Sequence, residues 1–246
     1  MHLYSIRFTQ NVTNSTTNTT TTTCNKRTNR QLDGIFARMY TFGNSGRNFP
    51  LNSIEAQVYC NETLDLIKNS DQYTKTCLKE YPKSLLSVLI KTVKTQTRQL
   101  CNSKTGKRLQ ELFHSADCIN SAKDEIQKCI NESVDILMAV KSMDDNQKLP
   151  ILCCGNHRLQ KCFHDQSLKI NNCNEEKIET SLRFLDSIQG NMISILCTKY
   201  DDSNDTCDRL SYPRRPVNDT TKRYKSVVMP IIRVLDSIRD PRLRSL

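Results

Sequence analysis

The spacing of the cysteines constrains the fold of this 246-residue chain more than any other feature of its sequence. Intervals of 11 and then 24 residues separate the members of two successive cysteine triplets: Cys118, Cys129 and Cys153, then Cys162, Cys173 and Cys197. A third interval of 24 residues runs from Cys77 to Cys101, after a looser interval of 17 residues that begins at Cys60. Repeated spacing indicates an internal repeat, so we predict about three similar helical units.

The segments within and around the 24-residue intervals carry the apolar periodicity of amphipathic helices. Steps of three and four residues place one buried stripe on each helix. The stripes are Leu78, Tyr81, Leu85, Leu89, Val93, Leu100; Ala122, Ile126, Ile130, Val134, Leu137, Val140; and Ile178, Leu182, Leu185, Ile188, Met192, Ile195. A polar break over 144–150 interrupts the second interval. With only six glycines in the chain, these stripes predict an all-α fold, built as a disulfide-stapled array of helices.

An even number of cysteines at repeated spacings predicts a disulfide framework. The twelve are Cys24, Cys60, Cys77, Cys101, Cys118, Cys129, Cys153, Cys154, Cys162, Cys173, Cys197 and Cys207. A straight helix of 24 residues is about 36 Å long, whereas the Cα atoms of a disulfide lie about 5.5 Å apart. Cys173 and Cys197 therefore pair with other cysteines, unless the chain folds back near Gly190. We expect the adjacent Cys153 and Cys154 to reach different partners, and the connectivity otherwise stays open.

Asn-x-Ser/Thr sequons together with many cysteines are typical of secreted proteins. Four sequons lie beside cysteines or in polar segments, and we predict glycosylation at them: Asn61, Asn131, Asn204 and Asn218. The N-terminus, MHLYSIRFTQNVTNSTT, lacks the apolar segment of a signal peptide. Secretion therefore implies a removed signal or a misassigned start. The alternative is a cytosolic protein whose cysteines are reduced or bind zinc.

The net charge of +10 belongs to the two ends of the chain. Basic residues exceed acidic ones by five in residues 1–50 and by six in residues 208–246, whereas residues 51–207 carry a net charge of −1. A near-neutral central part argues against nucleic-acid binding, although the basic tail is suited to contact acidic surfaces. No run of 18 apolar residues occurs, so we predict no transmembrane segment.

Composition divides the chain into three parts. Residues 1–50 begin with a Thr/Asn-rich tract and end in Gly, Asn and Pro, so we predict a disordered N-terminal segment. Residues 51–207 form the cysteine-rich helical domain. Residues 208–246 form a basic linker and an amphipathic tail helix over 224–240, which docks on the core, lies on a membrane surface or binds a partner. The dibasic pairs at 214–215 and 222–223 raise the alternative of a precursor that releases a basic C-terminal peptide.

The stretch LPILCCGNHRLQKCFHD (149–165) contains several residues of the types that act in catalysis or bind metals. Its Cys-Cys-x-x-His run resembles the start of the motif in secreted calcium-dependent phospholipases, where a calcium-binding aspartate follows the histidine. Here Arg158 follows His157, and a cation repels calcium and supplies no carboxylate oxygen. We therefore expect no phospholipase site.

The same stretch offers a possible zinc site at Cys154, His157, Cys162 and His164. Only the spacing from Cys154 to His157 suits zinc, and disulfides compete for both cysteines, so we predict no metal site and no cofactor. A hydrolase that uses His157 and His164 is a further alternative. Against it, neighbouring residues on a helix point about 100° apart, which separates His164 from Asp165. The chain also lacks the common nucleophile, phosphate-loop and metalloprotease motifs, and we predict no enzymatic activity.

Residues 58–207 resemble a family of secreted cysteine-rich helical proteins of arthropods, similar to the insect haemolymph glycoproteins. The segments FHSADCINSAKDEIQKC, LPILCC and SIQGNMISILC carry the resemblance, together with the cysteines that follow the adjacent pair. The resemblance implies a secreted, α-helical, disulfide-bonded fold and no established catalytic residue. We expect a secreted glycoprotein without catalytic activity, which binds an unknown protein partner or a small apolar ligand.

Overall fold

The computed structural model describes residues 24–102, 106–198, 200, 207–216, 218–219 and 221–240, and it confirms the all-α prediction. These residues form helices and no strands. The helices are α1 (Lys26–Tyr40), α2 (Ser53–Cys77), α3 (Glu80–Cys101), α4 (Lys107–Ser121), α5 (Lys123–Val140), α6 (Asp145–Ser167), α7 (Glu175–Cys197) and α8 (Val228–Ser237).

Asparagine side chains fix the starts of three of these helices. Asn25 accepts hydrogen bonds from the backbone N–H groups of the first turn of α1, and Asn174 does the same for α7. Asn52 caps α2, while Glu55 reaches back to the backbone N–H of Leu51 at 2.9 Å. This reciprocal arrangement satisfies donors that a helix end otherwise leaves free.

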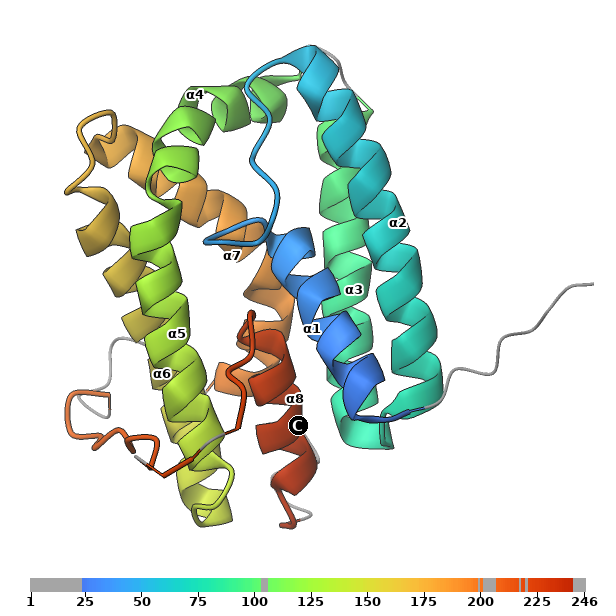
Figure 1. Cartoon of the computed structure of the whole chain (residues 1–246), viewed down its shortest axis with the longest axis vertical. Coiled ribbons are helices and arrows are strands. Elements are labelled where there is room, and N and C mark those ends of the chain that lie inside the picture. Colours follow the sequence, from blue (N-terminus) through green and yellow to red (C-terminus); the bar gives the residue numbers. More distant parts are fainter. Residues whose placement is uncertain are drawn as a thin grey trace, which may run out of the picture.

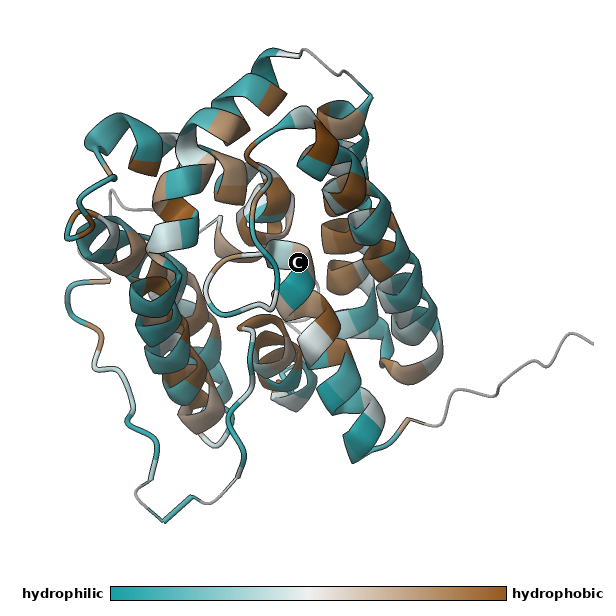
Figure 2. Cartoon of the chain, turned by 45° about the horizontal axis from the view of Figure 1, so that its top comes forward, coloured by the Kyte–Doolittle hydropathy of each residue, from teal (hydrophilic) through white to brown (hydrophobic). Residues whose placement is uncertain are grey.

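The helices pack around a shared apolar interior. In Figure 1, α2 and α3 form a pair on one side, α5 and α6 form a pair on the other, and α4 crosses the top. α7 packs against α3, α4 and α6, while α1 and α8 lie between the two pairs. Hydrophobic residues gather on the inward faces of the helices (Figure 2). The burial of these faces is the main source of stability in such a fold.

The predicted apolar stripes lie in this interior with one error. All six residues predicted around Cys129 are buried, and Leu85, Leu89, Val93 and Leu100 of α3 are buried too. In α7 the predicted Ile195 is 40% exposed, and Leu196 takes its place in the core. Leu196 continues the stripe because it lies four residues after Met192, whereas Ile195 is rotated by about 100° from Leu196.

Equal cysteine intervals correspond to different local structures. The intervals from Cys77 to Cys101 and from Cys173 to Cys197 each contain one continuous helix, α3 or α7. The interval between them in sequence, which ends at Cys153, contains the end of α5, a break and the start of α6. The break occupies 141–144 and not 144–150, because Pro150 lies inside α6. The prediction of about three equivalent units therefore stays unconfirmed.

The predicted disorder of residues 1–50 is wrong for the part that the structure describes. Residues 26–40 form α1, and its Leu32, Phe36 and Met39 lie fully buried in the main core. The expectation for residues 1–23 lies outside the described residues. The described part of this segment has the composition of a loop, because a short apolar cluster is followed by Gly, Asn and Pro. Its order comes from contacts with residues that lie far away in the sequence.

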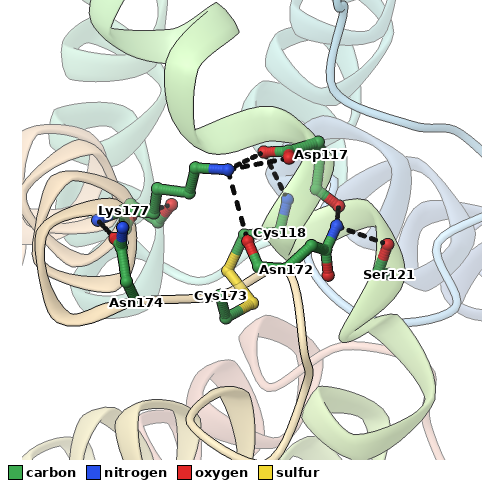
Figure 3. Close-up of a disulfide and its surroundings, with 8 residues drawn as sticks. Asp117, Cys118, Ser121, Asn172, Cys173, Asn174 and Lys177 are labelled. Atoms are coloured by element: carbon green, nitrogen blue, oxygen red, sulfur yellow. Dashed lines mark hydrogen bonds and ion pairs between the residues drawn. A yellow bond between two sulfur atoms is a disulfide. The ribbon is translucent and has the colours of Figure 1, made fainter.

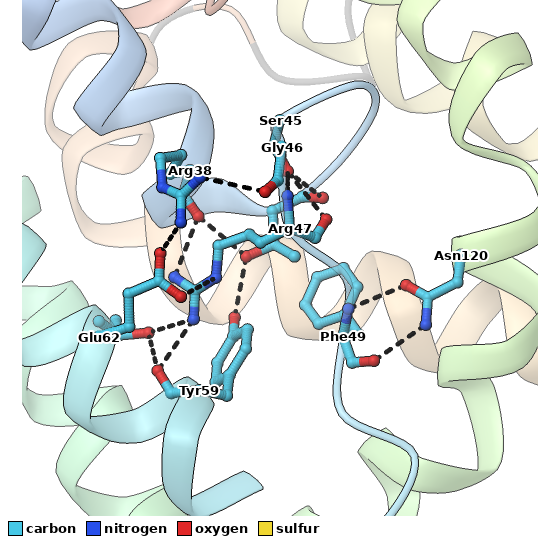
Figure 4. Close-up of polar contacts among 10 residues, drawn as sticks. Arg38, Ser45, Gly46, Arg47, Phe49, Tyr59, Glu62 and Asn120 are labelled. Carbon is cyan, nitrogen blue, oxygen red and sulfur yellow. Dashed lines mark hydrogen bonds and ion pairs between the residues drawn. The ribbon is translucent and has the colours of Figure 1, made fainter. Parts of the chain in front are cut away.

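Arg47 anchors the loop between α1 and α2 (Figure 4). Its guanidinium donates hydrogen bonds to the Tyr59 carbonyl and the Thr63 hydroxyl, both at 2.9 Å, and to the Arg38 carbonyl at 3.2 Å. It also lies 3.9 Å from the centre of the Tyr59 ring. Nearby, Phe49 and Asn120 exchange two hydrogen bonds of 2.8 and 2.9 Å, which tie the loop to α4.

The C-terminal helix belongs to the core, so the predicted boundary at 207/208 does not separate two domains. Of the alternatives for the tail helix, docking on the core is the one observed, and the helix begins at Val228 rather than at 224. Val234, Leu235 and Ile238 are fully buried. Asp33 of α1 receives the entering chain, because its carboxylate accepts hydrogen bonds from the backbone N–H groups of Lys225 and Ser226.

Candidate functional site

All twelve cysteines form disulfides, and none is free. The pairs are Cys24–Cys77, Cys60–Cys101, Cys118–Cys173, Cys129–Cys162, Cys153–Cys197 and Cys154–Cys207. The adjacent Cys153 and Cys154 reach different partners, and Cys173 does not pair with Cys197, so both expectations are confirmed. Every bridge joins segments at least 33 residues apart in sequence.

The two cysteine triplets cross-link each other in a reciprocal pattern. The first cysteine of each triplet pairs with the second cysteine of the other, and the third cysteines pair together. Cys118–Cys173 therefore joins α4 to the segment before α7, Cys129–Cys162 joins α5 to α6, and Cys153–Cys197 joins α6 to α7. The repeated spacing reflects these matched partners more than it reflects a repeated helical unit.

A polar network surrounds the Cys118–Cys173 bridge (Figure 3). Lys177 of α7 contacts both carboxylate oxygens of Asp117, at 3.0 and 2.8 Å, and donates to the Asn172 carbonyl at 3.2 Å. Asn172 in turn donates to the Asp117 carbonyl and to the Ser121 hydroxyl. Burial alone would raise the pKa of Asp117, but the hydrogen bonds from Lys177 and from the Cys118 N–H lower it.

The stretch 149–165 lies within α6 and forms a joint between helices. Cys154 and Cys162 are consumed in disulfides, so neither is available as a zinc ligand. Among the described residues, no group of three or more His, Cys, Asp or Glu side chains is placed to hold a metal ion.

His164 bridges two acidic residues at the joint between α6 and α7. Its Nε2 lies 2.7 Å from Glu175 Oε1, and its Nδ1 lies 3.2 Å from Asp165 Oδ1. The expectation that the helix would separate His164 from Asp165 is therefore wrong, because their flexible side chains bend together. The hydrogen bond to Glu175, and then the one to Asp165, raises the pKa of His164. Acidic side chains thus contact both ring nitrogens of His164. We call this ion-paired group of Asp165, His164 and Glu175 the clasp.

Two small apolar pockets lie among the helices, with volumes of about 40 and 30 Å³. Tyr40, Leu159, Gln189 and Val227 border both of them. Burial raises the pKa of the Tyr40 hydroxyl. Ligand pockets typically measure about 300–1,000 Å³, so neither of these two accommodates an acyl chain in this structure. The expected apolar ligand would have to bind elsewhere or open the core.

The predicted glycosylation sites differ in their accessibility. Asn61 on α2 and Asn218 in the segment before α8 are exposed. Asn131 on α5 is half-buried and accepts a 3.0 Å hydrogen bond from Gln127. Asn204 lies outside the described residues. Glycosylation at these four positions stays a prediction, with Asn61 and Asn218 the best placed to carry a glycan.

The basic residues before α8 contact acidic residues of the same chain. Arg215 lies 3.3 Å from Asp135 and 2.9 Å from Asp219, and Arg223 lies 2.6 Å from Asp135. Burial would raise the pKa of Asp135, but hydrogen bonds and charge from Arg223, with Arg215 adding to both, lower it. One arginine of each dibasic pair, Arg215 or Arg223, thus forms ion pairs within the chain. The residues after the second pair continue into the buried α8.

A third opening, of about 220 Å³, lies among α3, α4 and α7. Its border includes Arg108, Arg183 and Phe184. The sequence did not predict this pocket, because its residues come from three separate segments whose approach depends on the fold. The nearest signal was the apolar stripe of α3, which includes Leu100 at the pocket floor.

Comparison with known proteins identifies no relative. No family model, no curated protein and no solved structure matches the chain. The resemblance to insect haemolymph glycoproteins therefore remains a prediction. As to membranes, none of the described helices has the length and apolar character needed to cross a bilayer.

Proposed function

We propose that this protein is a secreted, disulfide-bonded helical glycoprotein that acts by binding and not by catalysis. The six disulfides, which use all twelve cysteines, carry this proposal. Disulfides form and persist in oxidising compartments, and a cytosolic protein seldom contains this number. The exposed sequons at Asn61 and Asn218 agree with passage through the secretory pathway.

The side chains with catalytic potential support the choice of binding over catalysis. The cysteines are oxidised in pairs, and His164 is held between Glu175 and Asp165. A general base needs an acceptor nitrogen within hydrogen-bond reach of the proton that it removes. In His164 both ring nitrogens already face carboxylates, so a hydrolase at this position would first have to break the clasp.

The binding site is proposed to lie elsewhere on the molecule, since these two apolar pockets have volumes of only about 40 and 30 Å³. A frame closed by six bridges presents surface residues in a fixed geometry, which reduces the entropy lost on binding. The ligand is proposed to be a small molecule with apolar character or a protein partner.

The proposal is tested by expressing the chain behind a heterologous signal peptide in animal cells. We expect the medium to contain protein with the six mapped disulfides, and we expect an N-glycosidase to reduce its mass. Asn61→Gln and Asn218→Gln should each remove one glycan. Free thiols throughout the folded protein, or zinc that co-purifies in stoichiometric amount, would overturn the proposal.

A further inference from the structure

We propose that the pocket among α3, α4 and α7 binds a small organic anion with a short apolar body, such as a medium-chain carboxylate. This inference rests on the proposed binding function and assigns it a site and a ligand class. The pocket has a volume of about 220 Å³. α7 packs against both α3 and α4.

The floor of the pocket is apolar. Leu100 of α3 and Leu112 of α4 contribute side chains that are mostly buried, and Phe184 of α7 is half-buried. Phe184 is held from behind by Phe49, whose ring centre lies 5.6 Å away in an edge-to-face arrangement. A rigid apolar floor of this kind suits a short hydrocarbon chain or an aromatic ring.

The rim of the pocket is positively charged. Arg108 and Arg183 border the pocket together with a single acidic residue, Glu111. The Nη1 atom of Arg108 donates to the side-chain oxygens of Gln96 and Gln99, both at 2.6 Å. Both partners are neutral, and no carboxylate among the described residues forms a salt bridge with Arg108. The two glutamines thus orient a guanidinium whose charge is not neutralised.

Arg183 supplies the second cationic group. Its Nη2 donates to the Thr180 hydroxyl at 2.8 Å, and its only carboxylate neighbour among the described residues, Glu179, lies 3.6 Å away. A guanidinium with free N–H groups binds a carboxylate through charge-assisted hydrogen bonds, which are stronger than neutral ones. Two arginines above an apolar floor therefore recognise an amphiphilic anion and discriminate against a neutral molecule of the same shape.

Isothermal titration of the oxidised full-length protein with octanoate, 1-octanol and octylamine tests this site. We expect octanoate to bind in a one-to-one complex and the other two molecules to bind at least about tenfold more weakly, which is the value of a charge-assisted hydrogen bond. Arg108→Gln should weaken octanoate binding by about tenfold. Ser187→Leu, which fills the pocket, should abolish it.

Arg98→Gln is the matched control, because Arg98 is an exposed arginine of α3 that does not border the pocket. It should bind octanoate as the unaltered protein does. Circular dichroism verifies that each variant is folded. Equal binding of octanoate and octanol, an equal loss in Arg98→Gln, or no octanoate binding at millimolar concentration would overturn the pocket assignment. None of these results affects the disulfide and secretion test, so failure of the site is distinguishable from failure of the proposed function.

Discussion

At the scale of single residues, Arg47 shows how one buried cation orders a segment with the composition of a loop. Its side chain is only 5% exposed, and burial lowers its pKa, while the neighbouring Tyr59 and Glu62 side chains oppose that effect. Its Nη1 and Nη2 atoms donate hydrogen bonds to three acceptors on α1 and α2. The link between the two helices at this end therefore depends on a buried charge whose terminal nitrogens are hydrogen-bonded and whose Nε lies 3.5 Å from the Glu62 carboxylate.

We predict that Arg47→Ala lowers the free energy of unfolding by about 2–4 kcal/mol, because it leaves buried acceptors without donors. Arg47→Lys should recover only part of the loss, since an ammonium group lacks the planar fork of donors. Chemical denaturation measures both effects. Arg30→Ala, at an exposed position of α1, should change stability by less than about 0.5 kcal/mol. An Arg47→Ala variant as stable as that control would contradict the anchoring role.

His164 makes the joint between α6 and α7 sensitive to pH. Its pKa in the folded protein is raised by Glu175 and Asp165, so the clasp contributes fully below the unfolded pKa and is lost as the pH rises through the folded pKa. We predict that the stability difference between the unaltered protein and His164→Gln is largest near pH 5.5 and shrinks as the pH rises through the folded pKa, where the imidazole loses its charge.

The size of this effect is limited by solvent, because Glu175 is exposed. Denaturant midpoints across this pH range measure it. Glu175→Gln removes the first partner and should flatten the same pH dependence. A difference that grows with rising pH would show that the clasp does not stabilise the folded protein.

At the scale of helices, the periodicity of the chain predicts which faces are buried, and it does so because one rule governs all amphipathic helices. The burial of the stripe from Ala122 to Val140 follows from its own periodicity, whatever helices it packs against. The same rule fails for the segment 43–50, whose order comes from Arg47 and from the Phe49–Asn120 pair. Such contacts join residues 71 positions apart, and no local pattern encodes them. The pocket residues Arg108 and Arg183 were unpredictable for the same reason.

The docking of α8 leads to a prediction about the proposed release of a C-terminal peptide. No disulfide lies beyond Cys207, so residues after a cut in 216–222 are held by packing, hydrogen bonds and ion pairs such as Arg223–Asp135, without a covalent link. Val234 and Ile238 are fully buried, and Asp33 holds the chain at Ser226. We predict that protein nicked at a single protease site inserted in this segment retains its C-terminal fragment, which ends at residue 246, during gel filtration in native buffer.

The nicked protein should lose this fragment in denaturant, where the packing is abolished. Val234→Asp, which places a charge in the core, should let the fragment leave in native buffer as well. Dissociation of the fragment from the nicked but otherwise unaltered protein, without denaturant, would instead favour the precursor hypothesis.

At the scale of the whole molecule, the disulfides connect the helices in two separate groups. Two bridges link α1, α2 and α3, and four link α4, α5, α6 and α7 with the segment at Cys207. No bridge joins the two groups or reaches α8, so packing and hydrogen bonds, rather than disulfides, hold these parts together. Cys24–Cys77 joins the start of α1 to the end of α2, and Cys153–Cys197 joins α6 to α7 through the main core. Closing a loop of 53 residues is worth about 4 kcal/mol in the chain-entropy model. We therefore predict that the double substitution Cys24→Ser and Cys77→Ser lowers the free energy of unfolding by up to that amount without abolishing the fold.

The six bridges should also differ in their resistance to reduction, because a thiolate must reach a sulfur atom to attack it. Cys24 is exposed, whereas Cys153 is fully buried and Cys197 is nearly so. We predict that a mild thiol reductant in native buffer opens Cys24–Cys77 first and leaves Cys153–Cys197 intact until the protein unfolds. Alkylation of samples taken at intervals, followed by peptide mass mapping, gives the order. In denaturant, burial no longer protects any bridge, so the two bridges should be reduced at similar rates. If Cys153–Cys197 is reduced early in native buffer, the core around it opens independently of the rest of the molecule.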